Sequence, residues 1–440
     1  MADTVGLHVL ATLDEAARQR LLLRTESDLS IFIERVKPII DAVRTEGDAA
    51  LVRLARDLDN AEIEDTGLAA TPEDFDAAFD EVEPAVIEAI EFAVAGIRAF
   101  HEIQKPDAMW FQEIRPGAYA GDRFRPIPSV ACYVPRGKGA FPSVAMMTTV
   151  PAVVAGVPRI VVVTPPGRDG MVDGATLVAA KLAGVDEIYK CGGAQAVAAV
   201  AYGTQTVPRC DKIVGPGSPY VAAAKTLLSG VIDPGIPAGP SESIVLADGG
   251  ANGRLAALDL IIESEHGADS SAFLVTDSRR VADEARAAVP KFWTKMGDQR
   301  AGYSAAVLGG PSGGIVLAPD WDAAIAFVND YAPEHLSILS ADPFADLGHI
   351  EHAGEILLGP HTPFTLGNFV LGPNAVLPTA GAARTVSPLS VFDFMKRSSV
   401  GYVTAAGYRS LAHHAHALAT YEGFDGHALA VSPARAKIME

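Results

Sequence analysis

The fold is decided by the stretch RIVVVTPPGRDGMVDGATLVAAKLAGVDEIYKCGGAQAVAAVAYG at residues 159–203. A short valine-rich run is followed by a proline and glycine turn, an alanine-rich segment, a second apolar run and a second glycine turn. Short apolar runs that alternate with helical segments are typical of strand–helix–strand units, in which the strands pair in parallel. This stretch therefore predicts part of a parallel sheet.

The same alternation continues on both sides of that stretch. SVACYVP near 129 and DKIVGPG near 211 complete a first set of four predicted strands. The spacing between them matches the length of a strand–helix crossover. A second set begins near 243 and comprises SIVLAD, AFLVTD near 272, GIVLAP near 314, HLSIL near 335 and GEILLG near 354. Two Rossmann-like lobes are therefore expected, and the second set resembles an internal duplication of the first.

The predicted fold class is α/β, with two Rossmann-like parallel-sheet lobes, a helical N-terminal region and a C-terminal helical arm. Segments before Pro106 place apolar residues three and four positions apart, which favours helices. We expect a helical region over 1–105, a first lobe on the cofactor side over 106–238, a second lobe over 239–378 and an arm over 379–440. Neither lobe contains the full GxGxxG fingerprint, so a dinucleotide site must be atypical.

Composition excludes several classes of protein. Apolar residues make up 49% of the 440 positions, and no apolar run is long enough to span a bilayer. The formal charge is −19 and basic residues form no patch, so nucleic acid and anionic membranes are not expected partners. The N-terminus lacks the pattern of a secretory signal and the three cysteines fit no disulfide framework, which indicates a cytoplasmic protein.

Two short segments carry residue types suited to catalysis or metal binding. Glu334 and His335 in YAPEHL combine a carboxylate with an imidazole, which can activate water and transfer protons near neutral pH. In LAALDLIIESEHG, helical spacing puts Asp259, Glu263 and His266 on one face, where they could present metal ligands. The structural alternatives are a turn cap beside a strand-edge histidine, and the polar face of an amphipathic helix.

Two further groups are weaker when taken alone. Near the C-terminus, TYEGFDGHALAV contains Glu422, Asp425 and His427, and the histidines of the preceding LAHHAHAL could equally lie on a solvated helix. Glycine-rich turns follow three predicted strands: PRGKG at 135–139, CGGAQA at 191–196 and GPGSPYV at 215–221. Such turns can receive a pyrophosphate, although ordinary strand-to-helix turns also need glycine.

Many segments, in order, resemble the histidinol dehydrogenase family from about Arg35 to the C-terminus. The matching stretches are YVPRGKGAFPS, IVVVTPP, VDEIYKCGGAQAVAAVAYGT, DKIVGPGSPYV, AGPSESIVLAD, ESEHGADS, APEHLSI, LGNFVLGPNAVLPT, LSVFDFMKR and EGFDGHA. The resemblance implies oxidation of a primary alcohol to a carboxylate in two NAD-dependent steps, through an aldehyde that stays in the site. It also implies one Zn²⁺ per subunit, acting as Lewis acid and template.

The resemblance also assigns roles to individual residues. Glu334 would activate the water that hydrates the aldehyde, and His335 would be the general base for the alcohol. The remaining positions match metal ligands (Glu263, His266, Asn368, His427), substrate contacts (Ser241, Glu422, Asn374) and NAD contacts (Tyr133, Gln195, Ser218). A homodimer is implied as well, in which the C-terminal arm reaches into the partner's active site.

Three departures from the family pattern fall in the predicted site. Glu263 stands where the family has a glutamine ligand, and Asn368 stands where it has an aspartate ligand, so the total ligand charge is unchanged. Oxygen and imidazole ligands still suit a divalent metal. Ala375 replaces a histidine that lies beside the imidazole of histidinol, which argues against histidinol as substrate.

With these departures, the sequence resembles a paralogue within the family that oxidises 2,3-dihydroxypropane-1-sulfonate to sulfolactate. A sulfonate needs cationic or N–H partners, and the sequence offers Arg136, Arg384, Lys396 and Arg397. Two alternatives stand beside this prediction. One is a histidinol dehydrogenase with unusual ligands, and the other is a catalytically silent paralogue that binds a metal or a nucleotide.

Overall fold

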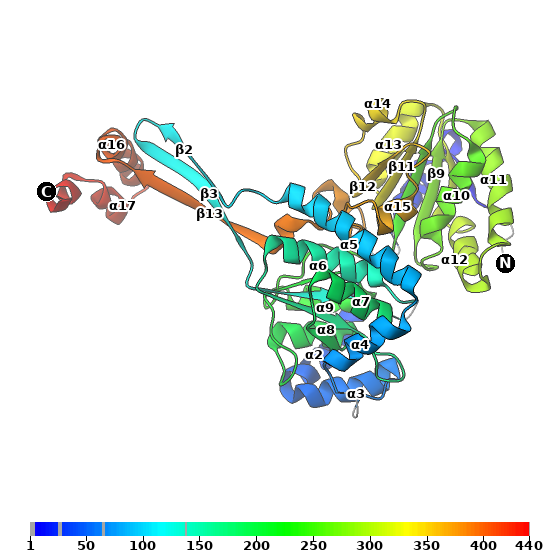
Figure 1. Ribbon diagram of the computed structural model, residues 1–440. Coiled ribbons are helices and arrows are strands. Elements are labelled where there is room, and N and C mark those ends of the chain that lie inside the picture. The colour runs from blue at the N-terminus through cyan, green and yellow to red at the C-terminus, as the bar shows by residue number, and fades with distance from the viewer. Residues whose placement is uncertain (1–4, 25–28, 64–66, 137–138, 440) are drawn as a thin grey trace. The chain divides into compact units, whose positions relative to one another are not determined.

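The computed structural model describes residues 5–24, 29–63, 67–136 and 139–439, and the chain divides into two units (Figure 1). Unit 1 comprises Met1–Gln104 and Ile127–Phe394, and unit 2 comprises Lys105–Pro126 and Met395–Glu440. Each unit has its own sheets, so the two are described separately. Of the glycine-rich turn at 135–139, Gly137 and Lys138 lie outside the described residues.

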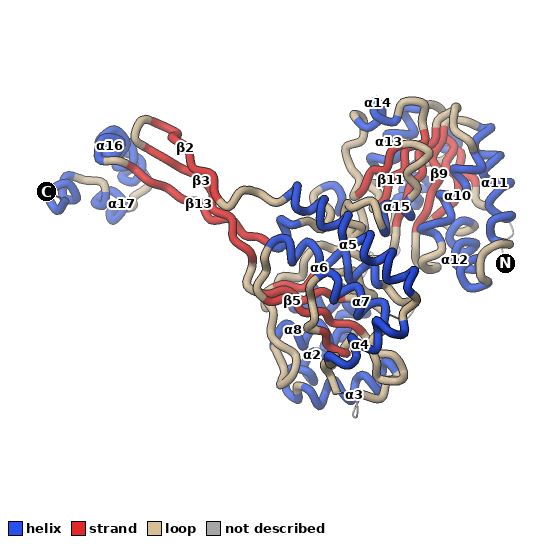
Figure 2. The backbone as a smooth tube through the Cα atoms, viewed as in Figure 1, coloured by secondary structure: helices blue, strands red, loops and turns tan. Residues whose placement is uncertain are grey.

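The first sheet of unit 1 has four parallel strands in the order β6-β5-β4-β7. Every residue of β4 is buried, as expected for a strand with helices on both faces. One face packs on α2, α3, α8 and α9, while α6 packs on the other beside α5 and α7, and α4 contacts α7 (Figures 1 and 2). The strands are β4 (Ser129–Tyr133), β5 (Arg159–Thr164), β6 (Ile188–Lys190) and β7 (Lys212–Val214). The helices are α2 (Ser30–Glu46), α3 (Asp48–Asp59), α4 (Pro72–Glu81), α5 (Pro84–Gln104), α6 (Pro142–Ala155), α7 (Gly174–Ala183), α8 (Gly193–Tyr202) and α9 (Pro219–Leu228).

The second sheet of unit 1 has six parallel strands in the order β1-β10-β9-β8-β11-β12. Its two faces are covered by α10, α11 and α12 and by α1 and α13, with α14 beside β11. The strands are β1 (Leu7–Val9), β8 (Glu242–Ala247), β9 (Ser271–Thr276), β10 (Gly313–Leu317), β11 (His335–Leu339) and β12 (Glu355–Leu358). The helices are α1 (Glu15–Leu22), α10 (Gly253–Ser264), α11 (Arg279–Trp293), α12 (Asp298–Leu308), α13 (Trp321–Tyr331), α14 (Pro343–Leu347) and α15 (Phe364–Phe369).

The predicted α/β fold with two parallel-sheet lobes is confirmed, and the predicted strands are present as β4 to β12. The N-terminal region is not wholly helical, however, because Leu7–Val9 forms β1 at the edge of the second sheet and pairs with β10. A strand of three residues is too short to show a periodicity that distinguishes it from a loop.

Unit 2 contains an antiparallel sheet in the order β13-β3-β2, followed by three helices. Gly121 of β3 lies so close to β2 that an added Cβ would be 1.9 Å from the carbonyl oxygen of Trp110. The elements are β2 (Met109–Arg115), β3 (Ala118–Pro126), β13 (Met395–Val403), α16 (Ala405–Tyr421), α17 (Asp425–Ala430) and α18 (Pro433–Met439).

The two units divide the chain differently from the predicted domains. Residues 109–126, expected at the start of the first lobe, form β2 and β3 of unit 2. Residues 379–394, expected in the arm, belong to unit 1 and include the 3-10 turns Ala382–Arg384 and Val391–Phe394. The pairing of β3 with β13 joins segments far apart in the chain, and single-strand patterns do not reveal such partners. Across the described residues, the helices are too short or too polar to cross a bilayer.

A buried ion pair ties the N-terminal segment to the second sheet. Arg24 Nε donates to Glu242 Oε1 at 2.8 Å, and only 9% and 5% of the two side chains are exposed. The Arg24 guanidinium also lies 3.5 Å from the centroid of the Tyr331 ring. Losing the arginine would leave the Glu242 carboxylate buried without its cation.

We expect Arg24→Ala to lower the free energy of unfolding by about 3–5 kcal/mol, the usual cost of leaving a buried charge unpaired. The matched control is Arg18→Ala, which breaks the exposed pair of Arg18 with Asp330. Exposed pairs contribute about 0–1 kcal/mol. Urea denaturation of both variants measures the difference, and equal losses would show that the Arg24 pair contributes no more than a surface contact.

Candidate functional site

A cleft of about 1060 Å³ in unit 1 has lining residues from both lobes. On the side of the four-stranded sheet, it is lined by the turns that follow β4 and β7, including Arg136 and Ser218. The chain runs β4, β5, β6 outward in one direction and then returns to place β7 on the other side of β4. Ligands of open parallel sheets bind at such a switch point, beside the carboxyl ends of the strands.

On the side of the six-stranded sheet, the cleft meets the starts of β8 and β11. Ser241 precedes β8, while Glu334 precedes β11 and His335 is its first residue. The chain again changes direction here, since β9 and β10 lie on one side of β8 and β11 and β12 on the other. The first residues of β8 and β11 are thereby brought side by side.

Glu334 is buried at the base of this arrangement. Its Oε2 accepts a hydrogen bond from the backbone N–H of Glu242 at 2.8 Å. Burial raises the pKa of Glu334 to about 8, although the positive charge of His335 opposes the rise. A carboxyl group with its pKa in this range can exchange a proton near the pH at which most enzymes work.

His335 lies between two carboxylates. Its Nδ1 is 3.0 Å from Glu355 Oε2, and its Nε2 is 3.8 Å from Glu334 Oε1. Burial alone would lower the pKa of His335, but the charges of Glu263 and Glu334, together with the contact to Glu355, raise it to about 10. The surrounding carboxylates therefore favour the protonated form of the imidazole next to the cleft.

A second cluster joins the end of α10 to α15. Asn368 Nδ2 donates to Glu263 Oε1 at 2.7 Å, and Ser241 Oγ lies 2.8 Å from His266 Nδ1. Glu263 Oε2 lies 2.9 Å from the same Nδ1, but the direction of approach makes no hydrogen bond. Burial would raise the pKa of Glu263, but the charges of His266 and His335 outweigh it and lower that pKa to about 2.

Glu263, His266, Asn368 and Ser241 all line the cleft together with Glu334 and His335. These four side chains offer oxygen and nitrogen donors of the kind that a divalent metal accepts. Within the described ranges, however, no three His, Cys, Asp or Glu side chains are gathered closely enough to hold a metal ion. Asp259 is absent from the described lining, and His266 lies beyond the end of α10 at Ser264, so the three residues do not share one regular helix face.

Three predicted contact residues are absent from the described lining of the cleft and are hydrogen-bonded within the fold. The side-chain amide of Asn374 donates to the carbonyl of Met147 at 2.6 Å and contacts His101, so it anchors the loop that precedes Ala375. The hydroxyl of Tyr133 accepts from the N–H of Gly193, and Gln195 donates to Asp59. We therefore interpret these three residues as supports of the loops around the cleft.

The remaining predicted residues are distributed between the two units. Ser218 lines the cleft, immediately before α9. Glu422 and His427 lie in unit 2 and are exposed, as are His413, His414 and His416 of α16. Of the four cations suggested for a sulfonate, Arg136 lines the cleft, and Lys396 and Arg397 belong to β13 of unit 2.

Several residues that shape the site were not predicted from the sequence. Glu355 and Glu242 are the first residues of buried strands, and a charged residue at the start of an apolar run is the one signal that marks them. Arg300 of α12 lines the cleft, and its Nη1 donates to the carbonyl of Glu265, the residue before His266. Arg384, by contrast, donates to the carbonyl of Asp330 and is absent from the described lining.

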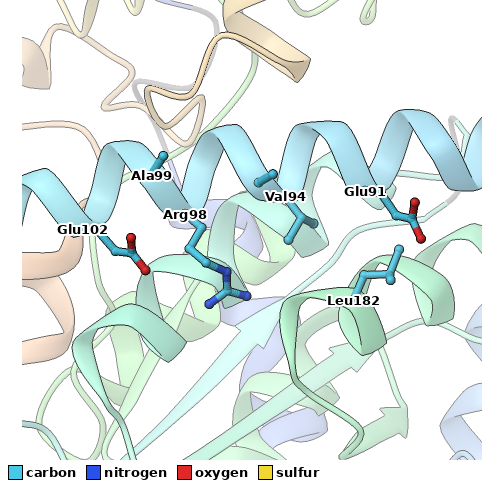
Figure 3. Close-up of a pocket in the computed structure, with 7 residues that line it drawn as sticks. Glu91, Val94, Arg98, Ala99, Glu102 and Leu182 are labelled. Atoms are coloured by element: carbon cyan, nitrogen blue, oxygen red, sulfur yellow. The ribbon is translucent and has the colours of Figure 1, made fainter.

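A smaller cavity of about 310 Å³ lies along α5 beside α7 (Figure 3). Glu91, Arg98 and Glu102 project from α5, and Leu182 comes from α7. Arg98 donates to the carbonyl of Ala183 at 3.0 Å, so it caps α7. None of the predicted site residues lines this cavity, and the larger cleft is the candidate active site.

Comparison with known proteins gives consistent matches over nearly the whole chain. The family model described as histidinol dehydrogenase matches residues 22–435. The chain is 64% identical to "Histidinol dehydrogenase homolog 2" of Mesorhizobium japonicum, over 99% of each chain. It is 48% identical to a histidinol dehydrogenase of Synechocystis sp., over 94% of this chain and 95% of that protein. The crystal structure of histidinol dehydrogenase from Elizabethkingia anophelis superposes with a TM-score of 0.93 at 30% identity, over 99% of each chain.

Proposed function

We propose, from the premise that the chain belongs to the histidinol dehydrogenase family, that it oxidises a primary alcohol through an aldehyde to a carboxylate. The family is one of NAD-dependent dehydrogenases, and the chain is an enzyme. The proposed substrate is 2,3-dihydroxypropane-1-sulfonate and the product sulfolactate, which is the activity of a sulfopropanediol 3-dehydrogenase. The observation that carries the proposal is the buried Glu334–His335 pair at the edge of the cleft.

The two proposed half-reactions use these two residues in turn. In the first, His335 accepts the proton of the alcohol hydroxyl, and a hydride leaves the carbon that bears this hydroxyl. The product is the aldehyde. In the second, Glu334 accepts a proton from water as the water oxygen adds to the aldehyde, and a second hydride leaves the hydrated carbon. Two NAD molecules accept the two hydrides, and water supplies the new oxygen atom. Each residue receives a proton only in its unprotonated form, and the raised pKa of Glu334, about 8, sets the pH above which its carboxylate is ionised.

The turns at the switch point support a dinucleotide site on the side of the four-stranded sheet. Pro216, Gly217 and Ser218 line the cleft before the first turn of α9. Lys225 Nζ donates to the carbonyl of Gly215 at 2.8 Å and so fixes this turn from inside the fold. Ser218 remains the proposed NAD contact, with Tyr133 and Gln195 acting through the turns that they hold.

The donors at the end of α10 support a zinc site. Glu263, His266 and Asn368 would hold the ion, and the buried Glu263 Oε2, which has no hydrogen-bond donor among the described residues, fits a divalent cation. When bound, zinc supplies Lewis-acid polarisation of the substrate oxygen. We propose His427 as the fourth ligand and Glu422 as a substrate contact.

The lining of the cleft supports an anionic substrate in place of an imidazole. Ala375 lines it with a methyl group, which offers no partner to an imidazole ring. Arg300 and Arg136 both line it and can pair with a sulfonate. Arg300 contacts the backbone of the segment that carries His266, so it is the favoured sulfonate partner.

We propose a homodimer in which unit 2 of one copy completes the site of the other. Unit 2 exposes many large apolar side chains for its size, which supports a partner surface. They are Met109, Trp110, Phe111 and Ile114 of β2, and Leu418, Tyr421, Phe424 and Leu429 of the C-terminal helices and their connections. In this homodimer, the exposed Glu422 and His427 would become buried.

The substrate proposal predicts a strong preference for the sulfonate diol over histidinol. With zinc and NAD present, kcat/KM for 2,3-dihydroxypropane-1-sulfonate should exceed that for histidinol by about 100-fold or more, because the cleft offers an anion partner and no imidazole partner. NADH absorbance should reach two equivalents per diol at completion. Comparable turnover of histidinol would instead favour a histidinol dehydrogenase, and no NAD reduction with either alcohol would favour a silent paralogue.

Two arginine substitutions test which residue binds the sulfonate. Arg300→Gln should raise KM for the sulfonate diol about 10- to 100-fold, the range for losing one charge-assisted hydrogen bond. Arg384→Gln is the matched control, since Arg384 does not line the described cleft, and it should leave KM unchanged. Equal effects of the two substitutions would remove Arg300 as the sulfonate partner.

The division of roles predicts different defects in the two half-reactions. His335→Asn should slow alcohol oxidation by about 10²–10⁴-fold, whereas Glu334→Gln should slow mainly the aldehyde step. Because Glu334 must be ionised to accept a proton, the wild-type aldehyde rate should rise with pH through about 8, its raised pKa. Glu334→Gln should abolish this rise. Equal losses in both steps, measured separately with alcohol and aldehyde, would contradict the division.

The zinc assignment predicts that Glu263→Ala reduces bound metal. After dialysis, mass spectrometry of the digested protein should find about one zinc per wild-type subunit and at least tenfold weaker retention in the variant, because ligand loss weakens the site. Asp259→Asn is the control, one turn earlier on α10 and absent from the described lining of the cleft. Unchanged zinc in Glu263→Ala would show that Glu263 is not a ligand.

A further inference from the structure

Two parallel strands bring His335 beside a carboxylate that the proposed reaction does not use. His335 and Glu355 are the first residues of β11 and β12, and they are Cα partners in the register of these strands. Side chains of register partners project from the same face of a sheet. His335 Nδ1 and Glu355 Oε2 are 3.0 Å apart, and both side chains are more than nine-tenths buried.

This contact determines which ring nitrogen carries the proton. An ionised carboxylate can only accept hydrogen bonds, so the Nδ1 atom of His335 must be the donor. In neutral His335, Nε2 then has the free lone pair, and this is the atom that lies 3.8 Å from Glu334 Oε1. The ring is also held by the edge-on Phe364, whose centroid is 5.7 Å from that of the imidazole.

The backbone of α15 packs closely against this carboxylate. A Cβ atom added to Gly367 would lie 2.6 Å from Glu355 Oε1, so the backbone of α15 fits closely around the carboxylate. Gly367 precedes Asn368, the proposed metal ligand. Glu355 therefore contacts both the segment that carries the proton acceptor and the segment that carries a ligand.

Stability alone does not account for this glutamate. Its Oε1 is buried and has no hydrogen-bond donor among the described residues. A buried carboxylate with an unsatisfied oxygen is costly, and apolar residues of similar size are often as stable or more stable at such positions. The benefit that remains is the orientation of His335.

We propose that Glu355 is a positioning residue that fixes His335 in the Nδ1–H tautomer and turns its Nε2 toward the reacting alcohol. This inference rests on the proposed function, in which His335 is the general base. Carboxylates that orient a histidine in this way are common in enzymes that use the ring as a base.

A double-mutant cycle tests the inference. Glu355→Gln should lower kcat for alcohol oxidation at least about tenfold with little change in KM, because substrate contacts remain while the base is misoriented. In the His335→Asn background, the same substitution should change kcat by less than about twofold, since Glu355 acts through the ring that is missing. Glu355→Asp is the second variant. It keeps the carboxylate but moves it away from the ring of His335, so it should also lower kcat.

Ser337→Ala is the matched control on β11. Its buried hydroxyl has no partner among the described residues, so its removal should leave kcat unchanged. Wild-type kcat in both Glu355 variants, or an equal loss with and without His335, would overturn the inference. An equal loss would mean that Glu355 only supports the fold.

A readout without substrate separates this inference from the proposed function. In ¹⁵N-histidine-labelled protein, assigned by comparison with His335→Asn and titrated to the pH at which the ring becomes neutral, the Nδ1 of His335 should keep its proton in the wild type and should lose this preference in Glu355→Gln. An unprotonated Nδ1 in the wild type would refute the positioning role. A wild type that shows this tautomer but oxidises neither alcohol would refute the proposed substrates and leave the positioning role standing.

Discussion

Four buried glutamates around one imidazole impose the main physical constraint on this protein. The charges of Glu263, Glu334 and Glu355 all raise the pKa of His335, and the charge of this ring lowers the pKa of Glu242 against the effect of burial. Isolated buried carboxylates are expensive, so each needs a cation or several donors. Arg24 pairs with Glu242. His266 and Asn368 contact Glu263, and His335 lies beside the remaining two carboxylates. The N-terminal segment, the end of α10 and the end of α15 are therefore held to one edge of one sheet by electrostatics.

The sequence predicted the parallel sheets well because their strands are buried on both faces. Such strands are continuous apolar runs, and β4 to β12 could be placed from these runs and the turns between them. Two features could not be predicted in this way. β1 has only three residues, and the sheet of unit 2 depends on pairing between segments near 120 and 400. Neither a short edge strand nor a distant antiparallel partner leaves a periodic signal in one sequence.

The candidate site was predictable where its residues adjoin a recognisable motif, as Glu334, His335, Glu263 and His266 do. Glu355 was missed because its importance comes from the register of β11 with β12, which no local pattern encodes. Asn374 shows the limit of such motifs. It lies in a matching segment, but its amide is hydrogen-bonded to Met147 and His101, and it is absent from the described lining of the cleft. A motif locates a segment, whereas side-chain direction follows from the backbone conformation.

The chemistry and the substrate are encoded by different parts of the fold. The residues proposed to handle protons lie at strand starts, where the pairing of β8, β11 and β12 fixes their spacing. The proposed recognition residues come from a loop at Ala375, a turn at Arg136 and a helix at Arg300, which can change without disturbing that pairing. On the proposed roles, a fold built on this plan can exchange an imidazole partner for an anion partner while keeping the strand starts that carry Glu334 and His335. Under the proposed function, such separation would let the substrate change while Glu334 and His335 keep their places.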